Sequence, residues 1–195
     1  MDISINNISK SFGDKLVLQN FSTIIYEHQY NFIMGPSGCG KTTLLNILMG
    51  FLCPDSGTIT GVPDKKSAVF QEDRLCDSFN AVSNVRMVCT SDIDTQTIKE
   101  HLASVGIKEN SIHLPVCELS GGMRRRVAIV RSILAESEVI FMDEPFKGLD
   151  TNTKQVVIQY VKENTQGKTV ILVTHDPDEV KEFDGNLVSM DIIEK

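Results

Sequence analysis

Short runs of β-branched and aromatic residues recur along the chain, and this pattern predicts strands separated by turns and helices. The early runs are typical of antiparallel strands at the edge of a fold. Three runs, at 31–34, 139–142 and 170–174, are typical of parallel strands covered on both faces, which need not alternate apolar and polar residues. The predicted strands are Ile3–Ile5, Phe21–Tyr26, Asn31–Met34, Thr58–Thr60, Ala68–Phe70, Val139–Met142, Val170–Thr174 and Leu187–Met190.

The region of residues 73–118 has a different pattern, with apolar residues at helical spacing and no convincing strand. Ile98, Leu102 and Val105 fall on one face of a predicted helix. We interpret this region as a helical lobe inserted into an α/β core. Because the chain has no repeats and no long low-complexity segment, we expect residues 1–195 to form a single domain.

Composition favours an ordinary globular protein. The hydrophobic content is 41%, and no apolar run approaches the ~20 residues that span a bilayer. No secretory signal is visible, and the five cysteines are scattered without metal-ligand spacing, so we expect reduced thiols and a cytoplasmic location. The formal net charge of -7 argues against a general nucleic-acid binder.

A glycine-rich stretch carries the spacing of a phosphate loop, Gly35-x4-Gly40-Lys41-Thr42, directly after a predicted strand and before a predicted helix. Backbone N–H groups of such a loop surround phosphates, the lysine neutralises their charge and the threonine hydroxyl binds Mg²⁺. The alternative is a glycine-rich turn that precedes a lysine by chance. Such a turn would not be expected to have a predicted strand directly before it and a predicted helix directly after it. The residues expected at the nucleotide are Gly35, Pro36, Ser37, Gly38, Cys39, Gly40, Lys41, Thr42 and Thr43.

Two adjacent acids follow the apolar strand predicted at 139–142. Asp143 is placed to hold a metal ion, and Glu144 is placed to act as the general base on an attacking water. A solvated acidic loop is the alternative, but it is uncommon directly after an apolar strand in a chain that also carries a phosphate loop.

Two further polar residues end predicted strands. His175 follows the strand at 170–174 and could hold the attacking water and the γ-phosphate in line with Glu144. Gln71 follows the strand at 68–70, where its amide could contact metal or water at the entrance to the helical lobe. By itself, neither His175 nor Gln71 would indicate catalysis. Catalysis is favoured because both residues follow predicted strands in a chain that also carries a phosphate loop and the acids Asp143 and Glu144.

A second glycine turn, Ser120-Gly121-Gly122, opens a basic helix with no phosphate-binding lysine beside it. Exposed N–H groups at a helix N-terminus favour an anion. Since one complete phosphate loop is already present, the chain has either two nucleotides or one nucleotide shared with another chain.

The order of these motifs resembles the ATP-binding subunit of an ABC transporter over nearly the whole chain. The motifs that carry the resemblance are Gly35–Thr43, Gln71, Leu119–Gly122, Asp143–Glu144, Gly148–Asp150 and His175. The resemblance implies an α/β P-loop NTPase core with an antiparallel β lobe and an inserted helical lobe. It also implies ATP and Mg²⁺ as ligands, and ATP hydrolysis as the reaction.

The resemblance further implies that two cassettes pack head to tail. The turn at Ser120–Gly122 of one would close over the ATP on the phosphate loop of the other, and Asp150 would lie at the seam. Phe12 would stack on adenine, although it could equally be a core residue of the edge sheet. Met123 replaces the glutamine usual in the family, which puts that one side-chain contact in doubt.

The implied partners are transmembrane permease subunits, a second ATPase cassette and, through the permease, a solute-binding protein. The protein would then be peripheral on the inner face of the cell membrane. The segments "VFQEDRL" and "DEPF" are most similar to those of importer ATPases of the nitrate, sulfonate and taurine type. Basic residues such as Arg124–Arg126 commonly follow the glycine turn in this family, so we expect no nucleic-acid partner. The short interval between Lys41 and Gln71 suggests a trimmed hairpin at Gly57–Asp64.

Other members of the same superfamily are alternatives. An exporter cassette would carry the same motifs. A DNA-repair ATPase would need a long coiled-coil insertion, and a translation factor would usually carry two cassettes in one chain. A purely structural cassette is disfavoured because Lys41, Asp143, Glu144 and His175 are all present.

Overall fold

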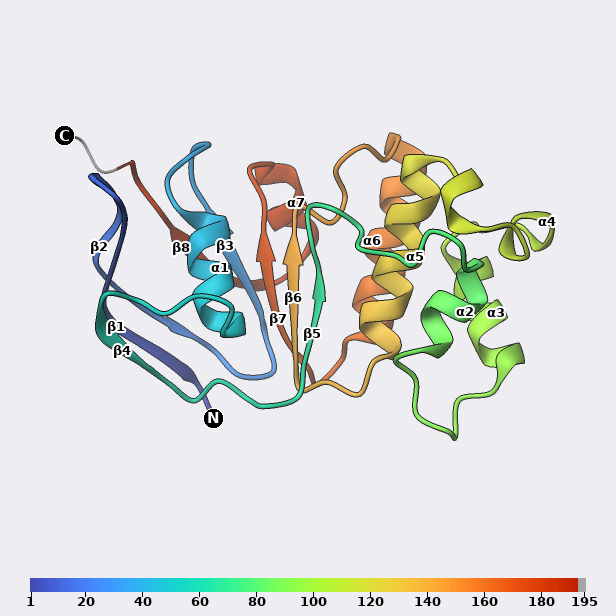
Figure 1. Ribbon diagram of the computed structural model, residues 1–195, viewed down its shortest axis with the longest axis horizontal. Coiled ribbons are helices and arrows are strands. Elements are labelled where there is room, and N and C mark those ends of the chain that lie inside the picture. Colours follow the sequence, from blue (N-terminus) through green and yellow to red (C-terminus); the bar gives the residue numbers. More distant parts are fainter. Residues whose placement is uncertain (193–195) are drawn as a thin grey trace.

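The computed structural model describes residues 1–192 and contains two sheets with helices packed around them (Figure 1). The larger sheet is parallel throughout, in the order β5-β6-β7-β3-β8. Its strands are β3 (Tyr30–Met34), β5 (Lys66–Val69), β6 (Val139–Asp143), β7 (Thr169–Val173) and β8 (Gly185–Ser189). The α/β class and the buried strands predicted near residues 31, 139 and 170 are confirmed.

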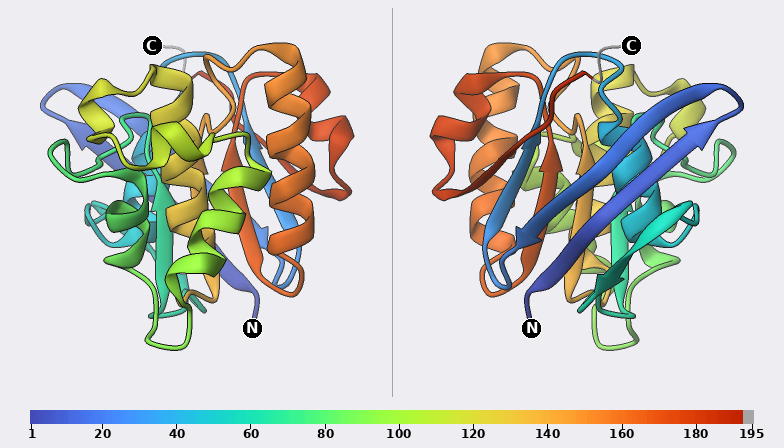
Figure 2. Two further views of the ribbon diagram at one scale, coloured as in Figure 1. Left: turned by 90° about the vertical axis from the view of Figure 1, so that its right-hand side faces the viewer. Right: turned by 90° about the vertical axis from the view of Figure 1, so that its left-hand side faces the viewer.

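The smaller sheet is antiparallel, in the order β2-β1-β4, and its two long strands cross one face of the molecule (Figure 2, right). Its strands are β1 (Ile3–Phe12), β2 (Lys15–Ile25) and β4 (Ser56–Thr60). Strands β1 and β2 are longer than the sequence pattern predicted. Asn7 and Asn20 adopt positive φ angles of 51° and 46°, and the irregular register there interrupts the apolar alternation.

The hairpin expected at Gly57–Asp64 is absent from the described residues. Strand β4 pairs with β1, whereas β5 pairs in parallel with β6 in the other sheet. The chain leaves β4 at Gly61, which has a φ of 82° and lies so close to Asp2 that a Cβ atom would be 2.2 Å from its carbonyl oxygen. The intervening residues therefore connect two sheets and do not form a turn within one.

Helices cover both faces of the parallel sheet (Figures 1 and 2). They are α1 (Lys41–Met49), α2 (Ala81–Arg86), α3 (Thr95–Ser104), α4 (Glu109–Ile112), the 3₁₀ helix η1 (Val116–Glu118), α5 (Gly121–Leu134), α6 (Thr151–Asn164) and α7 (Pro177–Glu182). Elements α2, α3, α4 and η1 all fall within the region predicted to be helical, and α3 buries the predicted residues Ile98 and Leu102.

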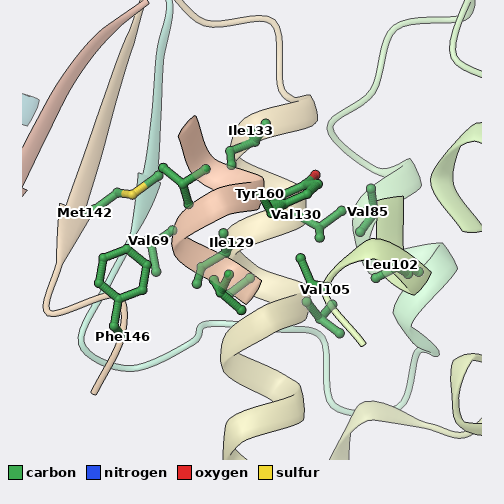
Figure 3. Close-up of a cluster of buried hydrophobic side chains, with 14 of the residues drawn as sticks. Val69, Val85, Leu102, Val105, Ile129, Val130, Ile133, Met142, Phe146 and Tyr160 are labelled. Atoms are coloured by element: carbon green, nitrogen blue, oxygen red, sulfur yellow. The ribbon is translucent and has the colours of Figure 1, made fainter. Parts of the chain in front are cut away.

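Neighbouring residues of the central strands face two different hydrophobic clusters. Phe141 of β6 packs with α1 and the antiparallel sheet, whereas Ile140 and Met142 pack with α5 and α6. The cluster that contains Ile140 and Met142 continues into the helical region, because Leu102 of α3 belongs to the same buried set as Tyr160 of α6 (Figure 3). This shared core fixes the helical region against α5 and α6.

Among the residues that the structure describes, none of the helices is long and apolar enough to cross a membrane.

Candidate nucleotide-binding site

The carboxyl ends of four parallel strands meet at one edge of the sheet, where they surround a cavity of about 620 Å³. This is the edge at which open α/β sheets bind ligands. The predicted residues that line the cavity are Phe12, Ser37, Gly38, Gly40, Lys41, Thr42, Thr43, Gln71, Asp143, Glu144 and His175. The structure thus brings together residues from five separate segments of the sequence.

The phosphate loop joins β3 to α1, and its lysine is bonded to the loop itself. The Lys41 ammonium donates hydrogen bonds to the carbonyl oxygens of Gly35 at 2.7 Å and Pro36 at 2.8 Å. Gly40 caps α1 with a φ of 101°, and a Cβ atom there would be 2.9 Å from Leu18. The loop therefore requires glycine at this position and presents a helix N-terminus and a cation to the cavity, a combination suited to phosphate.

Two predicted loop residues face inward. A Cβ atom on Gly35 would be 2.2 Å from the carbonyl oxygen of Met190, so glycine is needed there for close backbone packing. Cys39 is buried in the cluster that contains α1. The side chain of Cys39 is consequently directed away from the cavity, and neither Gly35, Pro36 nor Cys39 lines it.

Thr42 and Asp143 form a pair of oxygen ligands at the base of the cavity. The Thr42 hydroxyl donates to a carboxylate oxygen of Asp143 at 3.1 Å. Burial raises the pKa of Asp143, and the hydrogen bond from Thr42 only partly opposes this effect. A hard divalent cation would favour the ionised carboxylate and accepts hydroxyl and carboxylate oxygens as ligands, so these residues fit Mg²⁺.

Glu144 adopts an unusual backbone conformation with a φ of 47°. Its backbone N–H donates to the carbonyl oxygen of Val173 at 2.9 Å, which fixes it beside the end of β7. One carboxylate oxygen lies 3.1 Å from His175 Nδ1 and the other lies 2.6 Å from Lys147 Nζ. Glu144 and His175 are therefore already in contact, as the sequence-based assignment of a base and its orienting histidine requires.

A group of polar side chains, of which Thr174 and Glu179 are buried, supports the loop that carries His175. The Lys154 ammonium of α6 bridges Asp176 at 2.6 Å and Glu179 at 2.7 Å. Glu179 also accepts a hydrogen bond from the Thr174 hydroxyl at 2.6 Å. These contacts attach both residues flanking His175 to α6 and α7, and they restrict where the imidazole can lie.

We expect Lys154→Met to destabilise the protein by about 3 kcal/mol, because it leaves the buried Glu179 carboxylate without its cation. Hydrolysis should also fall, since the His175 loop loses an anchor. Urea unfolding provides the measurement, with Lys162→Met as the control on the same helix. The Lys162–Glu182 pair is more exposed, with a separation of 3.9 Å, so its loss should cost less than about 1 kcal/mol. Equal effects of the two changes would contradict this expectation.

Phe12 is 49% exposed at the end of β1. It lines the cavity with Lys15 and is not part of either hydrophobic cluster in the described residues. An aromatic ring held at the mouth of a phosphate-binding cavity is available for stacking on a base.

The basic side chains of α5 form ion pairs and hydrogen bonds with other segments of the same chain. Arg124 pairs with Asp77 at 2.8 Å, and Arg125 pairs with Asp73 at 3.2 Å. Arg125 also donates to the carbonyl oxygens of Phe70 and Gln71. Helix α5 therefore fixes the backbone that positions Gln71, and the Arg125 side chain is buried.

The structure does not bring the second glycine turn or Asp150 to the cavity. Ser120 caps α5 by accepting from the Met123 N–H at 3.3 Å, and Asp150 caps α6 by accepting from Thr153. A Cβ atom added to Gly121 would meet no other atom within 4 Å, and the φ of Gly121 is not in the left-handed region. Among the residues that the structure describes, no contact requires glycine at that position.

Three lysines at or near the site are missing from the residues predicted from the sequence: Lys15, Lys147 and Lys154. Lys15 and Lys147 line the cavity, and Lys154 supports the His175 loop. The one available signal was the position of Lys147, three residues after Glu144, which is a spacing at which side chains in a helical turn meet.

Comparison with known proteins gives a consistent result. The ABC transporter family matches residues 18–147. The taurine import ATP-binding protein of Roseobacter denitrificans is 38% identical, over 96% of this chain and 77% of its own length. An aliphatic sulfonates import ATP-binding protein of Rhodococcus jostii is 34% identical, over 97% of this chain and 71% of its own length.

A solved structure extends the likeness to the fold. The ATP-binding cassette MJ0796, in a dimeric post-hydrolysis state bound to ADP and Pi, superposes with a TM-score of 0.84. It is 26% identical, and the match covers 98% of this chain and 97% of that one. The P-loop fold predicted from the motifs is confirmed. The chain therefore belongs to the ABC transporter family of ATP-binding proteins.

Proposed function

We propose that this protein is the ATP-hydrolysing subunit of an ABC importer and that two copies enclose each ATP between them. The observation that carries this proposal is the division of the motifs. The phosphate loop, the metal ligands, Glu144 and His175 converge on one cavity, whereas the turn at Ser120–Gly122 does not line it. A second chain is needed to bring that turn to the nucleotide.

Within one chain, each residue at the cavity has a distinct role. Phe12 stacks on adenine, and Lys41 exchanges its bonds to the loop carbonyls for phosphate oxygens. Thr42, Asp143 and Gln71 would hold Mg²⁺, which when bound would neutralise developing phosphate charge. Glu144 accepts the proton of the attacking water, and His175 fixes the direction of that carboxylate.

The second chain completes the site. The Ser120 hydroxyl and the N–H groups of Gly121 and Gly122 lie at the N-terminus of α5 and approach the γ-phosphate held by the partner. Asp150, which begins α6, lies at the seam between the two chains. The two chains would close on ATP and separate after hydrolysis, and this movement would drive transport.

The membrane partners are proposed from the family and from the surface of the helical region. Phe79, Met87 and Leu114 are exposed there. Phe79 and Met87 follow the segment that carries Gln71 in the sequence, and Leu114 lies near Phe79 because Pro115 forms a β-bridge with Asn80. Apolar side chains at such a position suit contact with permease subunits, which would hold the protein at the inner face of the membrane. Relatives named for import of taurine and aliphatic sulfonates support a small solute that carries a sulfonate group, delivered by a solute-binding protein.

The shared site predicts that a blocked turn prevents dimer formation without preventing ATP binding. In a Glu144→Gln background, where hydrolysis cannot reopen the site, ATP should drive a dimer that is visible by size exclusion. Ser120→Arg places a bulky cation in the interface, so the ATP-dependent dimer should disappear. Binding of a fluorescent ATP analogue to the monomer should be nearly unchanged.

Gly121→Glu provides a second variant that keeps the helix cap. A Cβ atom at Gly121 meets no atom of the described residues within 4 Å, and glutamate suits the first turn of a helix better than glycine. The monomer should therefore be at least as stable as the wild type and still fail to dimerise. Asp94→Ala, which removes a comparable cap from α3, is the control that should dimerise. A dimer that survives the turn variants would mean that the turn acts within its own chain.

A further inference from the structure

The hairpin that joins β1 to β2 carries a lysine opposite Phe12. Its turn consists of Gly13 and Asp14, and Phe12 and Lys15 are direct partners on either side of that turn. Residues directly opposite each other in an antiparallel pair project their side chains to the same face. Phe12 and Lys15 both line the cavity, whereas Leu16, the next residue of β2, is not among the described residues that line it.

Strand β2 connects this lysine to the phosphate loop. Val17 also lines the cavity, and a Cβ atom on Gly40 would be 3.1 Å from the side chain of Val17. Two residues of a strand span about 7 Å. Lys15 therefore lies beside Phe12, on the strand of the hairpin that leads to the phosphate loop and about 7 Å along it from the point of contact.

The ammonium group of Lys15 is available for a ligand. Three lysines line the cavity in the part of the chain that the structure describes: Lys15, Lys41 and Lys147. Lys41 donates to carbonyl oxygens of the loop, and Lys147 donates to Glu144. Lys15 is exposed, and its side chain makes no ion pair or hydrogen bond with another described residue. An exposed lysine at a turn is usually a solvated residue, and its place on the cavity wall distinguishes Lys15 from that case.

We propose that Lys15 binds the α-phosphate of the nucleotide, where the triphosphate joins the adenosine. The proposal rests on the proposed function, which places the base on Phe12 and the β- and γ-phosphates at Lys41. The ribose and the α-phosphate are the parts of ATP that lie between these two positions. A lysine ammonium binds phosphate as a point charge, so a mobile side chain at this place is sufficient for the contact.

A contact to the α-phosphate predicts a specific dependence on the ligand. The α-phosphate is common to ATP and ADP, and it is independent of the base. Loss of Lys15 should therefore weaken the binding of ATP, ADP and GTP by the same factor. We expect the Kd to rise about 3- to 10-fold, because an exposed charge contributes less to affinity than a buried one.

The experiment measures the three affinities by competition, with unlabelled ATP, ADP or GTP displacing a fluorescent ATP analogue. It compares the wild type, Lys15→Met and Lys15→Arg, and the arginine variant should keep most of the affinity. The matched control is the double variant Lys15→Met/Leu16→Lys. It restores the net charge on the same hairpin but on the opposite face, because successive residues of a strand alternate, so its affinity should stay low.

Four results would overturn the inference. An unchanged Kd in Lys15→Met would exclude any contact. A larger loss for ATP than for ADP would move the contact to the γ-phosphate, and a loss for ATP without a loss for GTP would move it to the base. Recovery in the double variant would show that Lys15 acts only through general attraction of anions.

Lys41→Ala, assayed in parallel, separates failure of this inference from failure of the proposed function. If Lys41→Ala binds ATP weakly while Lys15→Met binds it like the wild type, the assignment of Lys15 fails and the nucleotide site remains. If Lys41→Ala also binds ATP like the wild type, the phosphate loop is wrongly assigned, and both the proposed function and the inference fail.

Discussion

Glu144→Gln is expected to bind ATP normally and to lose about 10²- to 10⁴-fold in hydrolysis, the usual contribution of a positioned general base. Glutamine has nearly the same shape and can still accept a hydrogen bond from Lys147. It cannot accept a proton from the attacking water at neutral pH. Phosphate release at saturating MgATP measures the loss, and binding of a fluorescent ATP analogue shows that the site is otherwise intact.

Glu136→Gln is the control for this change. Glu136 pairs with Lys65 on the surface and precedes β6, whereas Glu144 follows it, so the two carboxylates lie at opposite ends of one strand. The control removes a lysine–glutamate pair without touching the cavity and should hydrolyse ATP at the wild-type rate. A wild-type rate in Glu144→Gln itself would transfer the role of base to His175 or to solvent.

Lys41→Ala is expected to weaken ATP binding by about 10- to 100-fold, because a hydrogen bond to a charged group contributes about 1.5–3 kcal/mol. Hydrolysis should fall by at least about 10²-fold, since the loop also loses the cation that faces the charge developing on the transferred phosphate. The phosphate loop has no second mobile cation that could replace it. Titration with a fluorescent ATP analogue and a phosphate-release assay measure the two effects.

Lys99→Ala provides the comparison for the loss of one lysine. Lys99 pairs with Glu109 at 2.9 Å in the helical region, outside the cavity, and its removal should change neither binding nor hydrolysis. Undiminished turnover in Lys41→Ala would contradict the phosphate-loop assignment.

The sequence predicted the phosphate loop, Gln71, Asp143 and His175 because each of them directly follows an apolar strand. Buried parallel strands deliver their carboxyl ends to one edge, so Gln71, Asp143 and His175 had to meet the phosphate loop once all four strands shared a sheet. The apolar runs were enough for that prediction. No knowledge of side-chain contacts was needed.

Features that depend on pairing between strands were not predictable in the same way. The hairpin expected at Gly57–Asp64 was wrong because adjacent strands in the sequence joined different sheets. The full length of β1 and β2 was missed because Asn7 and Asn20 break the alternation, and hydrogen bonds to Ser22 and Ser9 then stabilise the irregular backbone. Such contacts depend on register, which could not be read from the apolar pattern where the alternation is broken.

The neighbours of the proposed base carry little signal in the sequence beyond the three-residue spacing of Lys147 from Glu144. Lys147 would have been read as an ordinary surface lysine, and its importance depends on the 2.6 Å contact to Glu144. Lys154 is farther removed, since it acts on His175 only through Asp176 and Glu179. Charged side chains on loops and helix surfaces carry no periodic signal that distinguishes a partner of the site from a solvated residue.

The left-handed backbone at Glu144 has a consequence for how this family of sequences can diverge. A residue other than glycine in that conformation costs about 1–3 kcal/mol, so the proposed base lowers the stability of the fold. Under the role proposed for Glu144, glutamate is kept there for hydrolysis at the expense of stability. In a descendant that no longer hydrolyses ATP, glycine would relieve this strain, and a glycine in the place of Glu144 would mark a cassette that has lost its catalytic role.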